Sequence, residues 1–426
     1  MKRRYDMIGF VFLAFFVMSL LTNILGALVP DIIASFQLTL TAAAVLPFSF
    51  FIAYGVMSIP AGLLIEAYRE KPVTLAAFLL SLAGTLLFAM RPGYAAAVVS
   101  LFLIGAGMAV LQVVLNPLLR AAGGEEHFAF NSAFAQLVFG SASFLSPRLY
   151  SYLVTGLSSK TGNDGRLLDA LARLAPARLP WVSMYWIFAM VSAVMLLIVA
   201  VSRFPAIERS ETERAGSWRR HRELLKNPLV VLYFIGVFLY VGSEQGTANW
   251  ISQFLSVYHR YDPQVTGANA VSWFWGLLTV GCLVGMLLLK LFDSRRVLVG
   301  GALGAMVSLT AALFGRRQVA LVAFPMVGLF ASVIWPVTVS LALNSVSKEH
   351  GAFSGILCTG IAGGALVPLV IGGIGDDLGL RAGMTVLYAT FGWSLIMGFW
   401  ARPIIVNKTL QWRRRPARAS VVKAGP

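Results

Sequence analysis

Charged residues are scarce in this sequence. Only 12% of its 426 residues are Asp, Glu, Lys or Arg, whereas 58% are hydrophobic. A soluble globular domain has about 25% charged and about 45–50% apolar residues. Packing in water cannot hide so much apolar surface, but lipid can cover it. The composition therefore predicts an integral membrane protein whose partner is the lipid bilayer.

The sequence also lacks the residue patterns from which many enzyme sites are built. Its two cysteines, Cys282 and Cys358, lie in apolar segments without the spacing of metal ligands. It contains no HExxH, GxSxG or Walker-type loop. We therefore expect a protein that is not an enzyme and that needs neither a cofactor nor a metal.

Apolar segments long enough to cross a membrane recur along the whole chain. A span takes about 20 apolar residues. The first segment, from Met7, is too long for the apolar region of a signal peptide and lacks a small-residue cleavage site. The predicted helices are 7–30, 41–65, 72–90, 95–119, 129–155, 181–203, 229–257, 267–292, 296–314, 318–345, 352–375 and 382–401. We expect an all-α membrane protein of twelve transmembrane helices in two pseudo-symmetric six-helix bundles.

A charged stretch between helices six and seven divides the chain. Residues 204–228 form the longest strongly charged segment inside the sequence, which is typical of a linker. The expected domains are an N-terminal bundle (1–203) and a C-terminal bundle (229–426) that ends in a basic tail. Residues 156–180 form the only other long predicted loop. Two related halves with a site between them are the arrangement of a secondary transporter.

Lys and Arg are distributed unevenly between the two sides of this predicted bundle. With both termini on one side, 24 of the 34 Lys and Arg residues fall on that side and 9 on the other, while Arg148 lies within a helix. The positive-inside rule places the termini and the linker in the cytoplasm. Topology and anionic lipids explain the net charge of +16, so we expect no nucleic-acid partner. The expected location is the bacterial inner membrane, with the protein as a multi-pass monomer.

One carboxylate falls in the middle of a predicted helix. The stretch "FLYVGSEQGTANWISQFL" (238–255) places Glu244 among apolar residues, together with Gln245 and Asn249. A charge at the bilayer centre costs about 2.5–3.5 kcal/mol on insertion scales and is a candidate functional group. Three interpretations stay open for Glu244: a structural tie between helices, an acceptor for a ligand hydroxyl, and a proton carrier.

Amides and tryptophans recur at similar depth in both halves. Gln112 and Asn116 are spaced by four residues and share one helix face. A single amide commonly ties two membrane helices together, and a tryptophan often only packs. As a group, however, the amides favour a hydrophilic cavity, and they offer the donors and acceptors that a hydroxyl-rich ligand requires. The candidate substrate-binding residues are Asn23, Gln112, Asn116, Asn131, Gln136, Glu244, Gln245, Asn249, Trp250, Trp273 and Trp335.

Several stretches, in this order and spacing, carry a resemblance to a known family. They are "QVVLNPLL" (112–119), "EEHFAFN" (125–131), "FLYVGSEQG" (238–246), "WFWGLLTVGCLVG" (273–285) and "GIAGGALVPLVIGGIGDDLG" (360–379). The chain resembles the major facilitator superfamily and, within it, the fucose–galactose–glucose:proton symporter family. The resemblance implies two six-helix bundles, a central sugar site and alternating access.

The sequence departs from that family at three charged positions. The bacterial fucose symporter has an Asp in helix one and a Glu in helix four, and the matching positions here are Gly26 and Gln112. An Arg usual in helix eight is replaced by Cys282. Glu244 matches a carboxylate found in many sugar transporters of the family. The candidates for proton coupling are therefore Glu244 and Asp31, the latter near the outer end of helix one.

Two loops at equivalent places in the halves carry similar charges. They are "EAYREKPV" (66–73) and "FDSRRVLV" (292–299), which resemble a reduced form of a loop common in the superfamily. The resemblance implies a cytoplasmic gate that latches by charge. Ordinary topology signals are the alternative. The candidate gating residues are Glu66, Arg69, Asp293 and Arg295.

The sequence as a whole predicts a secondary active transporter. We expect it to import a monosaccharide, such as glucose, galactose, mannose or fucose, by proton symport. An uncoupled or sodium-coupled sugar transporter remains open because two of the family's carboxylates are absent. An exporter of apolar compounds would favour aromatic and Met residues over amides as its lining, so the amide clustering argues against it.

Overall fold

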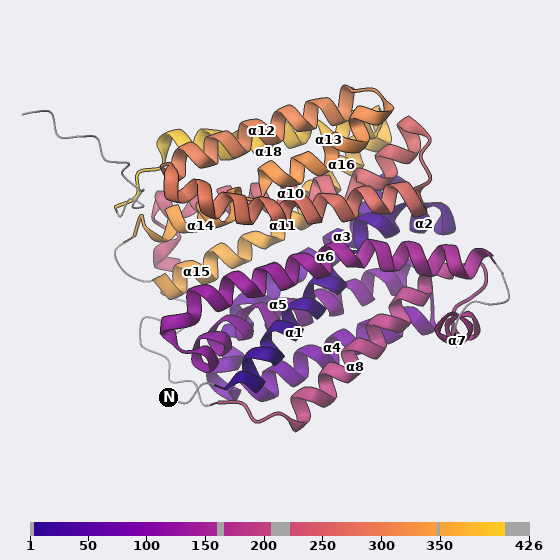
Figure 1. Ribbon diagram of the computed structural model, residues 1–426, viewed down its shortest axis with the longest axis horizontal. Coiled ribbons are helices and arrows are strands. Elements are labelled where there is room, and N and C mark those ends of the chain that lie inside the picture. Colours follow the sequence, from indigo (N-terminus) through magenta and orange to yellow (C-terminus); the bar gives the residue numbers. More distant parts are fainter. Residues whose placement is uncertain (1–3, 160–165, 206–221, 347–349, 405–426) are drawn as a thin grey trace, which may run out of the picture.

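The computed structural model describes residues 4–159, 166–205, 222–346 and 350–404, and in these ranges it is helical with no strand. The helices form two halves that lie side by side (Figure 1). Each half has its own cluster of buried apolar side chains, one drawn mainly from α1 to α8 and the other mainly from α10 to α18. This confirms the predicted fold class. Most of the linker predicted at 204–228, namely residues 206–221, lies outside the described ranges.

The first half runs from α1 to α8. Its elements are α1 (Tyr5–Thr22), α2 (Leu25–Phe36), α3 (Leu40–Tyr68), α4 (Glu70–Met90), α5 (Tyr94–Gly123), the 3₁₀ turn η1 (Glu125–His127), α6 (Phe128–Ser159), α7 (Arg166–Leu174), the 3₁₀ turn η2 (Pro180–Val182) and α8 (Ser183–Val201).

The second half runs from α10 to α18. Its elements are α10 (Pro228–His259), the π-helical turn η3 (Pro263–Gly267), α11 (Ala268–Leu291), α12 (Ser294–Phe314), α13 (Arg317–Ala331), α14 (Ile334–Leu343), α15 (His350–Thr359), the 3₁₀ turn η4 (Gly360–Ala362), α16 (Gly363–Leu378), α17 (Leu380–Met384) and α18 (Val386–Trp400).

Eleven spans in the described part of the chain are long and apolar enough to cross a membrane. The predicted fifth helix, α6, is not among them, although it is 32 residues long and packs along α1 and α11. Its sequence carries the polar residues Asn131, Ser132 and Gln136 and the charged Arg148, which lower its apolar character. With α6, the expected count of twelve is reached.

Four predicted helices are interrupted, and one predicted loop contains a helix. The helices predicted at 7–30, 318–345, 352–375 and 382–401 are each divided into two α-helical segments. Within the loop predicted at 156–180, α7 is an amphipathic helix that buries Leu168 and Leu171 and leaves Asp169 and Arg173 exposed. A two-turn helix is too short to stand out as a membrane span, which is why the loop prediction was wrong there.

The bundle has two ends, which differ in how the halves meet. At one end, which we call the terminal face, α1 begins and α18 ends. At the other end, which we call the opposite face, α2 and α10 end. The halves are joined along their length because α3 packs on α15 and α16, and α6 packs on α11. At the opposite face α2 also packs on α10. Among the described residues, no comparable packing joins α1 to α10 or α5 to α14.

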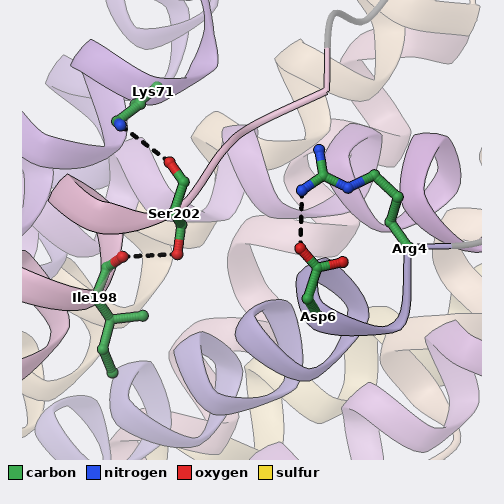
Figure 2. A network of polar contacts seen from close by, with 5 residues as sticks. All are labelled: Arg4, Asp6, Lys71, Ile198 and Ser202. Carbon is green, nitrogen blue, oxygen red and sulfur yellow. Dashed lines mark hydrogen bonds and ion pairs between the residues drawn. The ribbon is translucent and has the colours of Figure 1, made fainter.

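One polar contact at the terminal face joins two helices of the first half. Lys71 of α4 donates to the carbonyl oxygens of Ala200 (2.8 Å) and Ser202 (2.9 Å), so it caps the end of α8 in the same half. Figure 2 shows the contact of Lys71 with Ser202, together with the Arg4–Asp6 ion pair, whose nitrogen and oxygen lie 2.8 Å apart. A lysine at a helix C-terminus is stabilising because the last carbonyls lack helical partners.

Candidate functional site

Glu244 lies halfway along α10, with a partner on its own helix. Its Oε2 accepts a hydrogen bond of 2.6 Å from Tyr240, one turn earlier. Tyr240 is fully buried, and its ring centroid is 6.4 Å from that of Trp335 on α14. Glu244 itself is only partly buried. The carboxylate is therefore held in orientation by one donor while part of its surface stays accessible.

Two amides follow Glu244 on α10 and are both buried. Gln245 packs beside Gly364 of α16, where an added Cβ would lie 3.1 Å from its Cγ. Asn249 is 3% exposed, and its Nδ2 has no hydrogen-bond partner within the described ranges. Leaving such a donor unpaired costs about 1–3 kcal/mol. Asn249 is thus a donor available to a polar group that enters the bundle.

Three amides of the first half are accessible in the long helices α5 and α6. Gln112 on α5 is partly exposed, and Asn116 on α5 and Gln136 on α6 are exposed. Pro117 lies directly after Asn116 and removes one helical hydrogen bond. Amides in transmembrane helices usually face the bundle interior or a water-filled cavity because lipid offers them no partner. These three side chains have the chemistry of a polar lining.

Asn23 and Asn131 make their contacts inside the first half. Asn23 lies at the break between α1 and α2, and its Nδ2 donates to Ser143 Oγ at 2.8 Å. Ser143 in turn shares a 2.6 Å hydrogen bond with Ser19. Asn131 lies against Gly123, at the hairpin between α5 and α6. Both side chains are buried, so in this arrangement they tie helices of one half together.

The three candidate tryptophans have different surroundings. Trp250 is buried, and its Nε1 donates to the Pro368 carbonyl of α16 at 3.4 Å. Trp273 on α11 is 48% exposed and packs edge-on against Phe144 of α6, with the Arg148 guanidinium 5.4 Å from its ring. Trp335, partly buried beside Tyr240, is the one whose ring contacts the partner of Glu244.

Asp31, the second candidate for proton coupling, lies on α2 and bridges the two halves. It accepts hydrogen bonds from Tyr150 of α6 and from Gln264 Nε2, which belongs to η3 of the other half and lies 3.1 and 3.2 Å from its two oxygens. Asp31 is partly buried. Its place is therefore a contact between the halves rather than the middle of the bundle.

The candidate gating charges lie at the ends of α3 and α12. Asp293 Oδ1 accepts from the backbone N of Arg295 at 2.9 Å and from its Nε at 3.3 Å, and so caps α12 within its own half. Arg69 connects α3 to α4 with a left-handed φ of 66°. The described residues contain no group of His, Cys, Asp and Glu arranged to hold a metal ion.

The surroundings of Gly26 give a physical reason for the absence of a carboxylate at this position. Its Cα faces α10 so closely that an added Cβ would overlap the Ala248 carbonyl oxygen and approach the Asn249 Cα to 3.3 Å. No side chain fits at position 26 while α2 and α10 are in contact. Sequence reasoning identified the glycine but missed this contact, as it missed Tyr240, Tyr150 and Gln264. Only Tyr240 had a visible signal, its four-residue spacing from Glu244.

Two six-helix halves with polar side chains along the helices between them define a secondary membrane transporter. The family model described as "Major Facilitator Superfamily" matches residues 11–288, and the chain belongs to that superfamily.

Comparison with curated proteins and solved structures agrees with this assignment. The chain is 30% identical over 384 residues to a glucose/galactose transporter of Brucella abortus, with 87% of both chains covered. It is 25% identical to the L-fucose-proton symporter of Escherichia coli, with 86% of both covered. The crystal structure of the superfamily transporter FucP in the outward conformation is similar in fold, with a TM-score of 0.65, 21% identity, and coverage of 93% of this chain and 98% of that one.

Proposed function

We propose that this protein imports a monosaccharide by alternating access, in symport with a proton. The observation that carries the proposal is a set of polar groups from both halves. The first half offers accessible Gln112, Asn116 and Gln136. The second half offers Glu244 and the Asn249 Nδ2, which has no hydrogen-bond partner among the described residues. Together they offer donors and acceptors from both halves, as a hydroxyl-rich ligand requires. Similarity to glucose/galactose and fucose transporters supports the same substrate class.

Glu244 is the residue proposed to carry the proton. The hydrogen bond that it accepts from Tyr240 comes from the same helix. The carboxyl is therefore free to bind and release a proton without breaking a contact between the halves. A sugar hydroxyl bound by the same carboxyl would link proton and substrate. The absence of carboxylates at Gly26 and Gln112 favours an uncoupled sugar transporter as the second candidate.

The distribution of Lys and Arg supports a cytoplasmic terminal face in the bacterial inner membrane. With that orientation the contact between α2 and α10 closes the outer face, and the conformation is inward-facing. The accessibility of Asn116 and Gln136 fits a centre that is open toward the terminal face. The protein is proposed to act as a monomer.

Uptake into proteoliposomes tests the proposal. Purified protein is reconstituted, and entry of labelled glucose, galactose, mannose and fucose is followed with and without an imposed inward proton gradient, and with sodium in place of the gradient. The proposal expects one or more hexoses to accumulate only under the proton gradient. Equilibration without accumulation would favour the uncoupled transporter. Accumulation with sodium alone would mean that sodium, and not the proton, is the coupling ion. No entry of any of the four sugars would contradict the substrate class.

A further inference from the structure

Two carboxylates at the opposite face each accept hydrogen bonds from the other half of the molecule. Asp376 is at the end of α16, and its oxygens accept from Leu40 N (2.7 Å), Thr41 N (2.9 Å) and Thr41 Oγ1 (2.5 Å) at the start of α3. Asp31 on α2 accepts from Gln264, at the start of the segment that leads into α11. Each carboxylate thus joins one half to the other.

Asp376, which belongs to the second half, caps the start of α3 in the first half. The first N–H groups of any α-helix lack helical partners, and a carboxylate satisfies them while also facing the positive end of the helix dipole. In α3 one of these groups, Ala42 N, is bonded by Thr39 of the same half. Leu40 N and Thr41 N are bonded by Asp376 instead. This cap exists only while α16 lies against the start of α3.

Both contacts are made at the start of a second span, although Asp376 belongs to the fifth span of the second half and Asp31 to the first span of the first half. The second span of the first half begins at α3 and meets α16, which belongs to the fifth span of the second half. The second span of the second half begins at η3 and meets α6, the fifth span of the first half, from which Tyr150 also donates to Asp31. Between the two contacts, α2 crosses α10 at Gly26 and Ala248.

We propose that Asp31 and Asp376 are the two latches of a gate that closes the opposite face. Their hydrogen bonds to the other half stabilise the closed gate and break each time the gate opens. The inference rests on the proposed function in one respect, namely that the protein works by alternating access. It assigns Asp31 to the gate, so that Glu244 alone is left for the coupling proton.

The two latches are expected to differ in strength. Asp31 is partly buried, whereas Asp376 is exposed, so water replaces the bonds of Asp376 more readily when the gate opens. Hydrogen bonds between exposed groups contribute less to stability than buried ones because water competes for both partners. Loss of either latch alone should raise the population of the open gate modestly, and loss of both should raise it clearly.

Distance measurements between two spin labels test the gate directly. Cys282 and Cys358 are replaced by Ala, and labels are attached at positions 34 on α2 and 257 on α10, both exposed at the opposite face and on different halves. Double electron–electron resonance spectroscopy then gives the populations of the short (closed) and long (open) distances between the labels, in detergent and without any sugar present. The variants are Gln264→Ala, Asp376→Ala and the two combined.

Two matched control variants show whether a shift in the populations is due to the hydrogen bonds between the halves. Asp377→Ala removes an exposed carboxylate next to Asp376 that makes none of the three bonds to α3. Tyr150→Phe removes the bond to Asp31 that stays within the first half. The proposal expects the combined variant to raise the ratio of open to closed populations at least about fivefold, with less than twofold in either control.

Either of two outcomes would overturn the gate. One is an unchanged distance distribution in the combined variant, provided that it elutes as a folded monodisperse protein. The other is an equal shift in the controls, which would mean that any change at this face loosens it. Because no sugar is used, these outcomes leave the proposed transport function standing. Failure of sugar uptake in proteoliposomes would, conversely, leave the gate standing.

Discussion

The centre of the bundle and its opposite face each hold a carboxylate, and the two are bonded differently. Glu244 at the centre accepts from Tyr240, a residue of its own helix. Asp31 at the opposite face accepts from Gln264 of the other half. A group bonded only within its own helix can exchange protons and ligands without moving the halves. A group bonded across the halves has to break that bond whenever they separate. We therefore propose that substrate and proton bind at the centre and that the opposite face controls the conformation.

The largest effect is expected from Gly26→Ala, which adds a methyl group at the closest contact of the opposite face. The added methyl group would overlap the Ala248 carbonyl while the face is closed. Overpacking costs about 1–3 kcal/mol, which changes the ratio of two states by about 5–150-fold. We expect the population to move toward an open opposite face, measured with the spin labels at positions 34 and 257.

Gly9→Ala is the matched control for this substitution. Gly9 lies on α1 in the same span, and an added Cβ there meets nothing within 4 Å. It should therefore leave the distances as they are. If Gly26→Ala behaved like Gly9→Ala, the account of closure at the opposite face would be wrong.

Smaller effects are expected when single amides are removed from the centre. Gln112→Ala, Asn116→Ala, Gln136→Ala and Asn249→Ala should each weaken sugar binding by about 1 kcal/mol or more, or at least about fivefold, because a sugar hydroxyl loses its partner. Calorimetry on purified protein measures the affinity. Asn269→Ala is the control, since the Asn269 amide donates to Val265 one turn away on its own segment. Unchanged affinity in three of the four variants would remove the amides from the site.

The smallest effect is expected at the terminal face. Glu66→Gln combined with Asp293→Asn should shift the equilibrium further toward an open terminal face, because both residues are proposed to latch it in the alternate state. Surface charges contribute about 0–1 kcal/mol, so the shift should stay below about fivefold. Spin labels at positions 68 and 291, both exposed near the terminal face, measure it. Asp169→Asn on α7 is the control. A shift in the reverse direction would refute the latch at this face.

The fold could be predicted from the sequence because lipid imposes a simple rule on every span. Apolar runs of sufficient length must be helices, so the halves and their order follow from the positions of these runs and of the charged stretch between them. Interruptions were not predictable to the same degree. The break at Asn23 has no glycine or proline at the break itself, and Pro30 lies a full turn inside α2. α7 escaped notice because two turns of amphipathic helix resemble a loop in a window of membrane length.

The candidate site could be predicted in kind but not in partners. Glu244 and the amides stand out because polar groups in apolar helices are costly. The sequence does not reveal that Asn23 bonds Ser143, some 120 residues away, or that Asp376 caps α3 from 335 residues away. Such pairs depend on how the two halves dock. The glycine at position 26 was visible as a departure from a family pattern, yet its reason lies in the backbone of α10.

The most direct test of the account compares two modes of transport in the Glu244→Gln variant. The substitution keeps the shape of the side chain and one oxygen acceptor but cannot bind a proton. In proteoliposomes, accumulation of sugar under an inward proton gradient should be lost, while exchange of labelled for unlabelled sugar at equal concentrations should continue, because exchange needs no net proton movement. Asp31→Asn should retain proton-driven accumulation at a changed rate. A Glu244→Gln variant that still concentrates sugar under the gradient would contradict the assignment of the proton to the centre of the bundle.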